Sequence, residues 1–295
     1  MAELRECLWG YLFAIPWLLG LLIFVIGPIL VSMALSFTKY DVIRWPTFIG
    51  TANYKRAFFE DDLFWPSLAR TFKYALAVVP LGIGGSLCLA LLLNQGLFGT
   101  NLFRTFYFMP HLTPAVAMAL LWTWLLHPTI GPVNYLLSLI GIKGPGWFAS
   151  SEWALPSVII VNLWAYLGGN HMLIFLAGLQ GVPQELYDAA DVDGAGRWRK
   201  FWNVTLPMIS PSLFFNLIMG IIGSLKVFTI AFVATSGGPH WATWFYALHL
   251  YNWSFVYFEM GYGAALAWIF AFILIILTMI QFAISRRWVY YAGGR

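Results

Sequence analysis

Residues 185–207 read ELYDAADVDGAGRWRKFWNVTLP, a polar segment of mixed charge that separates two long uncharged stretches. The whole chain is 61% hydrophobic and only 9% charged, whereas soluble domains have roughly 25% charged residues. This composition predicts an integral membrane protein. Solvation of a membrane protein does not require a charged, helix-forming segment here, so the segment indicates contact with a partner outside the bilayer.

Outward from this segment, the charges are clustered and leave uncharged stretches at 7–38, 74–103, 105–142, 153–184, 201–225 and 261–285. Each stretch holds the ~20 apolar residues that cross a bilayer, and helices are expected because lipid offers the backbone no hydrogen-bond partners. The first stretch exceeds the h-region of a signal peptide, so we expect it to be retained. We predict an all-α membrane protein with one domain, 1–295, and six helices at 9–36, 69–93, 105–126, 155–179, 207–233 and 261–284.

The opening segment itself predicts a helix, a turn and a second helix. Pro183 precedes a strong helix-forming run, where its missing amide costs nothing. Gly194 and Gly196 end that run, because glycine accepts the positive φ of a helix terminus. An amphipathic stretch that starts near Trp198 follows. Such a unit can lie across a membrane surface and press into a groove on a soluble partner.

The same segment resembles the Glu-Ala-Ala, three residues, Gly, nine residues, Ile, one residue, Leu-Pro pattern of binding-protein-dependent ABC importer permeases. The chain has Asp188-Ala189-Ala190, Gly194, Val204 and Leu206-Pro207 at the same intervals, with Asp for Glu and Val for Ile. The string 186–198, the TSGGP at 235–239 and the GYG at 261–263 are similar to the carbohydrate-importing branch. The resemblance covers essentially the whole chain.

This resemblance implies a type I permease architecture in the prokaryotic plasma (inner) membrane, with both termini cytoplasmic. It implies a heterodimer with a second permease subunit, a dimer of ATPase subunits, and an extracytoplasmic solute-binding protein that delivers the sugar substrate. The chain has no GxxxxGK[ST] loop, so ATP and Mg are expected on the partner ATPase, with no cofactor in this chain. Residues 183–206 would be the ATPase-coupling loop. Its candidate residues are Glu185, Asp188, Ala189, Ala190, Gly194, Gly196, Leu206 and Pro207.

The candidates for a substrate path lie in the expected fourth and fifth helices, because sugar sites combine aromatic faces with amide and hydroxyl groups. They are Trp164, Asn170, His171, Gly220, Ser224, Lys226 and Val227. Gly220, Ser224 and Val227 follow from the resemblance to maltose-type importers, and only Ser224 offers a polar group there. Lys226 reads as a cation inside a span, which should face water, an acid or the partner. Hydrogen bonds between helices remain the alternative for Asn170 and His171, and packing remains the alternative for Trp164.

The residues alone leave two other functions open. A secondary transporter would need acidic groups near the bilayer midplane, and the nearest acid is Glu259 at the outer edge of the sixth helix. An intramembrane enzyme acting on lipid-linked sugars would need a paired acid, a His-metal set or a Ser/Lys dyad. The acidic run 60–62 is interpreted as a solvated turn, and the five histidines lack H-E-x-x-H spacing, so no catalytic residue or metal site is predicted. The sequence does not name the sugar.

Overall fold

A computed structural model of the chain describes residues 2–96 and 98–290. The described residues divide into two compact units, the first formed by those up to 64 with 249–273 and the second by those within 65–248 with 274–290. The boundaries between the units fall at the start of α4 (Phe64–Leu93) and within α14 (Tyr246–Tyr251) and α15 (Met260–Ser285).

The first unit contains the first helical stretch and a small hairpin. Its elements are α1 (Ala2–Leu21), η1 (Leu22–Ile26), α2 (Gly27–Ser36), β1 (Thr38–Lys39), β2 (Thr47–Phe48), α3 (Ala52–Phe59) and η6 (Asn252–Val256). The two strands pair antiparallel, with Thr38 opposite Phe48. The Asn53 side-chain amide donates to the carbonyl oxygens of Ser36 (2.8 Å) and Thr38 (2.9 Å), which fixes the chain where α2 ends.

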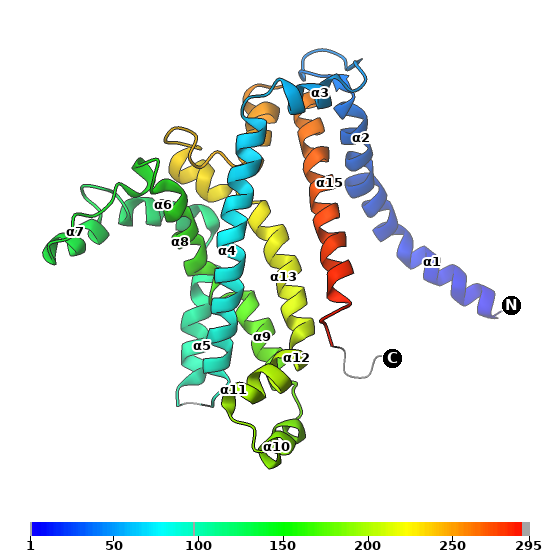
Figure 1. Cartoon of the computed structure of the whole chain (residues 1–295). Helices are drawn as coiled ribbons and strands as arrows, with labels where there is room; N and C mark the ends of the chain where they lie inside the picture. The colour runs from blue at the N-terminus through cyan, green and yellow to red at the C-terminus, as the bar shows by residue number, and fades with distance from the viewer. Residues whose placement is uncertain (1, 97, 291–295) are drawn as a thin grey trace. The chain divides into compact units, whose positions relative to one another are not determined.

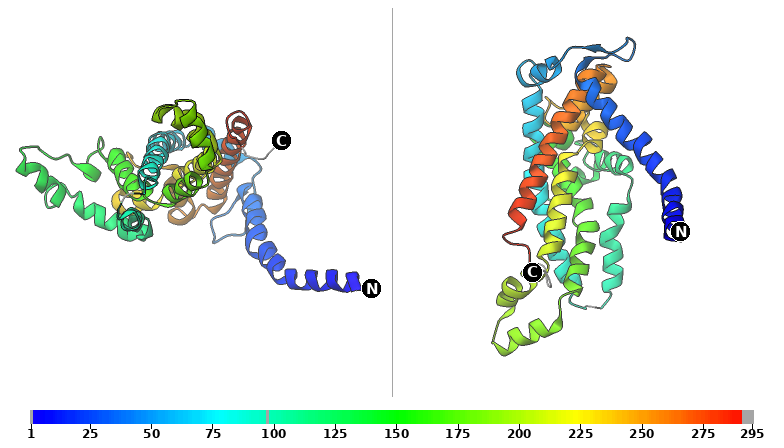
Figure 2. Two further views of the ribbon diagram at one scale, coloured as in Figure 1. Left: turned by 90° about the horizontal axis from the view of Figure 1, so that it is seen from below. Right: turned by 90° about the vertical axis from the view of Figure 1, so that its right-hand side faces the viewer.

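The second unit is a helical bundle in which α4, α9 and α13 run alongside one another (Figure 1, Figure 2). Its elements are α4 (Phe64–Leu93), α5 (Thr100–Phe108), η2 (Met109–Leu112), α6 (Ala115–Leu125), α7 (Pro132–Leu139), η3 (Trp147–Ala149), α8 (Ala154–Tyr166), α9 (Asn170–Gln180), α10 (Gln184–Val192), α11 (Arg197–Lys200), η4 (Phe201–Thr205), α12 (Leu206–Met208), α13 (Ser210–Leu225) and η5 (Ala231–Thr235). Val79 and Ile83 of α4 pack with Met172 and Phe175 of α9 in the buried core.

Six helical segments are apolar and long enough to cross a membrane when each bent pair among the described residues counts as one. Three are uninterrupted, at Tyr11–Ser36, Phe64–Leu93 and Met260–Ser285. They coincide with the helices expected at 9–36, 69–93 and 261–284. The all-α fold with six apolar segments is therefore the one that the composition indicated.

The other three expected helices are not continuous, and here the sequence interpretation was wrong in detail. Bends of 95°, 43° and 67° divide the segments within 100–125, 154–180 and 197–225. Pro114 lies at the first bend and Pro211 follows the third, and neither has an amide to continue a helix. The helix expected at 207–233 also ends early, at Leu225.

A glycine at the second bend allows two backbones to approach closely. Gly168 lies in the break between α8 and α9, and a β-carbon there would clash with the carbonyl of Tyr107 in α5. Small residues at such positions let membrane helices pack closely. The bend therefore serves the packing of the bundle.

Candidate functional site

The hairpin formed by residues 184–208 lies at one end of the second unit, past α9 (Figure 1). Its first helix, α10, begins after Pro183 and ends in a Schellman motif. Ala195 donates its amide to Ala190 O (2.9 Å), and Gly194 donates its amide to Asp191 O (3.0 Å). Gly194 has φ +69°, the left-handed conformation that this motif requires and that glycine adopts without strain. The predicted helix, turn and helix are confirmed.

Two side-chain contacts join the halves of the hairpin. The hydroxyls of Tyr187 in α10 and Thr205 in η4 are 3.0 Å apart. Asp191, also in α10, forms an ion pair with Lys200 at the end of α11. The segment Arg197–Met208 is helical throughout, with a π-helical turn between α11 and α12. These contacts join α10 to the second helix.

The residues predicted for coupling all lie in this hairpin. Glu185, Asp188, Ala189, Gly194 and Gly196 are exposed. Leu186 is also 40% exposed, and Val192 at the end of α10 is 89% exposed. An α10 surface of small, acidic and apolar groups is therefore open for a partner.

The remaining predicted residues connect the hairpin to the bundle. Ala190, Leu206 and Pro207 are half-buried, and the Ser210 hydroxyl donates to Pro207 O (2.6 Å). The amide of Tyr290, near the chain end, donates in turn to Ser210 Oγ (2.8 Å). Ile209 between these elements is 1% exposed and belongs to the core with α4 and α9. The hairpin is therefore connected directly to the base of α13.

Part of the predicted substrate path forms a polar cluster between α8, α9 and α13. His171 Nδ1 lies 2.7 Å from Asn216 Oδ1, and the Asn216 amide donates to His171 O (3.2 Å). The Tyr166 ring stacks on His171 with centroids 4.5 Å apart. The Tyr166 hydroxyl reaches the carbonyl of Gly220 (3.5 Å). His171 thus makes the interhelical hydrogen bond that the sequence left as an alternative.

The other predicted path residues make no side-chain hydrogen bond or ring contact to this cluster in the described part of the chain. Asn170 is exposed at the first position of α9. Trp164 packs edge-to-face on Trp122, with centroids 5.5 Å apart. Buried Ser224 donates back to Ile221 O (3.0 Å) within its own helix. Val227 is buried, 8% exposed.

Lys226 corrects the sequence interpretation. It was read as a cation within a span, but it caps the end of α13 and is exposed. The residues after it are not helical until 229. Because the helix has already ended, the premise of a lysine held inside a continuous span was wrong.

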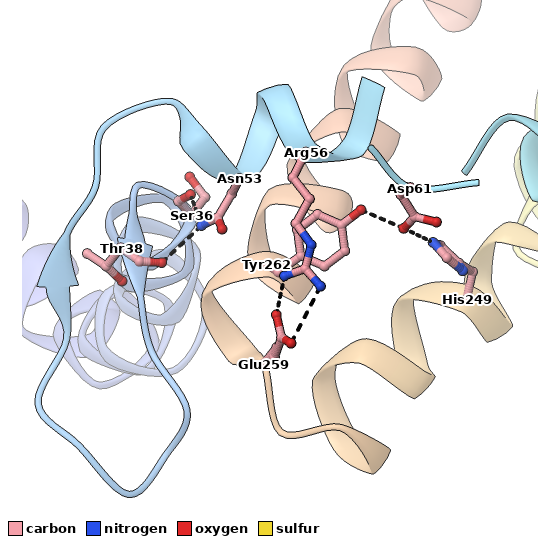
Figure 3. A network of polar contacts seen from close by, with 8 residues as sticks. All are labelled: Ser36, Thr38, Asn53, Arg56, Asp61, His249, Glu259 and Tyr262. Carbon is pink, nitrogen blue, oxygen red and sulfur yellow. Dashed lines mark hydrogen bonds and ion pairs between the residues drawn. The ribbon is translucent and has the colours of Figure 1, made fainter. Parts of the chain in front are cut away.

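A polar network in the first unit was missed by the sequence interpretation (Figure 3). Asp61 Oδ2 accepts a hydrogen bond from the Tyr262 hydroxyl (2.6 Å) and lies 2.9 Å from His249 Nε2. Asp61 Oδ1 accepts the amide of Leu63 (3.0 Å). The side chains of His249 and Asp61 are 1% and 6% exposed. The expectation of a solvated turn was therefore wrong for Asp61, although Glu60 and Asp62 are exposed.

The same network continues through Arg56, whose guanidinium forms an ion pair with Glu259 (Figure 3). That guanidinium also lies over the rings of Trp253 (4.5 Å) and Tyr262 (4.4 Å), a cation–π arrangement. Glu259, the acid that a secondary transporter would have needed, is thus engaged by an arginine. No sequence spacing could reveal these pairs, because their partners are 188 to 203 residues apart.

The electrostatics of Asp61 follow from these contacts. Burial by itself would raise the pKa of the Asp61 carboxyl, but the hydrogen bonds with His249 and Tyr262 outweigh it and lower the pKa to about 2. Asp61 therefore stays ionised at neutral pH. Within residues 2–96 and 98–290 no three His, Cys, Asp or Glu side chains gather where they could hold a metal ion.

Comparison with known proteins agrees with the all-α membrane fold. The family model described as "Binding-protein-dependent transport system inner membrane component" matches residues 79–290. The probable ABC transporter permease protein YesP of Bacillus subtilis is 39% identical over 97% of this chain and 93% of its own length. The sulfoquinovosyl glycerol transport system permease protein SmoG of Agrobacterium fabrum is 35% identical over 81% of this chain and 77% of its own length.

A chain in the crystal structure of a bacterial ABC transporter for import of the acidic polysaccharide alginate has the same fold. Its TM-score is 0.86 at 23% identity, with 97% of this chain and 98% of that chain covered. The protein therefore belongs to the family of inner-membrane components of binding-protein-dependent transport systems. It is a multi-pass membrane permease, not itself an enzyme, and this assignment replaces the two other functions that the residues alone left open.

Proposed function

We propose that this chain is one of two permease subunits of an ATP-driven importer for a carbohydrate or a glycoside. The relative SmoG, named as a transport permease for sulfoquinovosyl glycerol, supports the substrate class. The observation that carries the proposal is the hairpin at 184–208, whose exposed α10 lies in a chain matched by the family model over 79–290. The sugar would be delivered by a solute-binding protein, and both termini would be cytoplasmic.

In this proposal α10 docks onto a partner ATPase, which holds ATP and Mg. Glu185, Asp188 and Ala189 are the exposed residues that contact it. Tyr187 and Asp191 fasten α10 to the second helix, and Pro207 and Ser210 pass the motion to α13. A partner can shift a conformational equilibrium only through contacts that differ between the two states. If the contacts of the ATPase with α10 differ between the two states, a rigid hairpin passes that difference to α13, because it transmits displacement without bending.

The sugar would pass the cluster of Tyr166, His171 and Asn216 between α8, α9 and α13. Tyr166 and His171 are half-buried and would offer an aromatic face beside an imidazole group, whereas Asn216 is buried and orients His171 through two hydrogen bonds. Ser224 and Gly220 lie further along α13, and Trp164 and Asn170 flank the cluster on α8 and α9. The partner permease would supply the other side of the path.

Copurification tests this function. The tagged chain, extracted from its native membrane in detergent, should retain an ATPase subunit and a second permease. Asp188→Lys should lower the recovered ATPase about tenfold or more, because a reversed charge in a docking surface costs several kcal/mol, while the second permease remains bound. Asp62→Lys reverses an exposed acid outside the hairpin and should leave both partners in place. Recovery of the chain without any ATPase, or equal ATPase recovery with Asp188→Lys, would contradict the proposal.

A further inference from the structure

The second half of the hairpin presents a surface that the coupling role of α10 does not use. Trp198 is 77% exposed and Trp202 is 59% exposed. They are four residues apart on the helical segment Arg197–Met208, so they lie on one face. Phe201 packs edge-on against both indoles, with centroids 6.4 Å and 5.4 Å away. Three aromatic rings thus form one patch beside the coupling helix.

The charges around this patch are basic. Arg197 and Arg199 are exposed and have no ionic partner in the described part of the chain. Lys200 is engaged by Asp191 of α10. In contrast, α10 carries the acids Glu185, Asp188 and Asp191. The two halves of the hairpin therefore suit partners of different charge, and the basic half suits an anionic one.

The geometry places the patch at a bilayer surface. Arg197–Met208 continues directly into the span that contains α13, and the two segments meet at 67°. Membrane-spanning helices are tilted by about 20° on average. When α13 crosses the bilayer, Arg197–Met208 therefore lies closer to the membrane plane than to its normal. Indole rings and arginines in that position match the interfacial zone, where rings enter the headgroup layer and cations meet lipid phosphates.

We propose that Arg197–Trp202 is a binding surface for anionic phospholipid headgroups, in which Trp198 and Trp202 enter the interface and Arg197 and Arg199 contact phosphate. This surface is separate from the α10 surface proposed for the ATPase. It makes the hairpin a lever that is docked to the ATPase at one half and to lipid at the other. Anionic lipid would then bias the position of the hairpin and so the rate of coupled transport.

The test uses the full transporter complex in nanodiscs, with no ATP and no sugar. One set of discs contains phosphatidylglycerol with a photoactivatable headgroup, and the other contains the same probe on phosphatidylcholine. After illumination, mass spectrometry measures lipid attached to the peptide that contains residues 197–202. Phosphatidylglycerol should label this peptide several-fold more than phosphatidylcholine, since each basic residue near an anionic surface contributes about fivefold.

Three variants separate the contributions. Arg197→Gln with Arg199→Gln should bring the two labelling yields close to equality, and Arg197→Lys with Arg199→Lys should restore the preference because charge is retained. Trp198→Ala with Trp202→Ala should lower labelling by both lipids. The matched control removes the exposed pair Arg286 and Arg287 after α15 by the same Gln substitutions. It should not change labelling of residues 197–202.

Equal labelling of the wild-type peptide by the two lipids would overturn the proposal. Labelling that appears only when the ATPase is left out would also overturn it and would assign the patch to the ATPase. Because the measurement needs no transport, its outcome is independent of the substrate and coupling roles proposed above.

Discussion

At the scale of single residues, Gly194 and Gly196 look alike in sequence but differ in what they do. Gly194 has a positive φ, whereas Gly196 has φ −67°, which any residue adopts. A β-carbon at either position meets nothing within 4 Å. The difference between the two glycines is therefore purely conformational.

This difference predicts the effect of alanine at each position. Gly194→Ala should destabilise the end of α10 by roughly 1–2 kcal/mol, the cost of a left-handed alanine. ATP-driven uptake in reconstituted vesicles should fall, while membrane insertion and the amount of protein remain normal. Gly196→Ala is the comparison: it replaces no residue of positive φ and should lower uptake less, by no more than the loss of the glycine N-cap of α11. Equal uptake by the two variants would show that the Schellman turn has no role in coupling.

Asp61 gives a prediction about pH. Its pKa is lowered to about 2 in the folded protein, below the ordinary value near 3.9. The carboxylate therefore stabilises the fold fully above about pH 4, and this contribution of about 2 kcal/mol is lost as pH falls toward 2. In detergent, Asp61→Asn should lower the melting temperature at neutral pH and lessen its fall between pH 4 and 2.5. Asp62→Asn, at an exposed neighbour, should keep the parent's pH profile.

The hairpin and the network at Asp61 show which site residues the sequence could predict. The hairpin was predicted because its signals are local, namely Pro183 before a helix, glycines after it and fixed intervals up to Leu206. The network at Asp61 was not predicted, because its partners come from distant segments that only the fold brings together. Lys226 was misplaced for a third reason. An apolar stretch does not reveal where its helix ends.

At the scale of helices, composition located the apolar segments but not their breaks. The uninterrupted helix α15 coincides with an uncharged stretch and α4 overlaps one, since length and hydropathy suffice to locate them. The bends at Pro114 and Gly168 were missed, because an apolar stretch reads the same whether its helix is straight or broken. Proline and glycine were the available signals. They are also tolerated inside membrane helices, so alone they did not decide the matter.

The break at Gly168 makes a prediction about packing. Gly168→Ala forces a methyl group against the Tyr107 carbonyl and should destabilise the bundle by at least about 1–3 kcal/mol, as overpacking does. Gly84→Ala within α4 meets no atom within 4 Å and should be neutral or slightly stabilising. Thermal unfolding of the two purified variants in detergent compares them. A Gly168→Ala protein as stable as Gly84→Ala would mean that α5 and α8 shift apart freely.

At the scale of the whole molecule, the chain has the surface of a subunit. An 18-residue apolar window within Tyr11–Ser36 has no buried residue in the described chain, and Phe13 and Phe24 are 77% and 78% exposed. Such a helix is covered by lipid or by other subunits in the membrane. Such exposure is expected of a permease that assembles with other subunits.

We therefore expect no ATP hydrolysis by the chain reconstituted alone, because it has no phosphate-binding loop. Addition of the partner ATPase and second permease should bring hydrolysis that the loaded binding protein stimulates. The release of inorganic phosphate, measured with the proteins in vesicles, compares the lone chain with the assembled transporter. Uptake of a sugar by the lone chain in vesicles would contradict the subunit assignment.

The hydrogen bond from the Tyr290 amide to Ser210 has a practical consequence for handling the protein. It ties the last described residue to the base of α13, next to the hairpin. A bulky tag fused close to this hydrogen bond would compete for space at the base of α13. Protein for activity assays should therefore carry the tag behind a long flexible spacer, and a short spacer is expected to depress turnover without lowering yield.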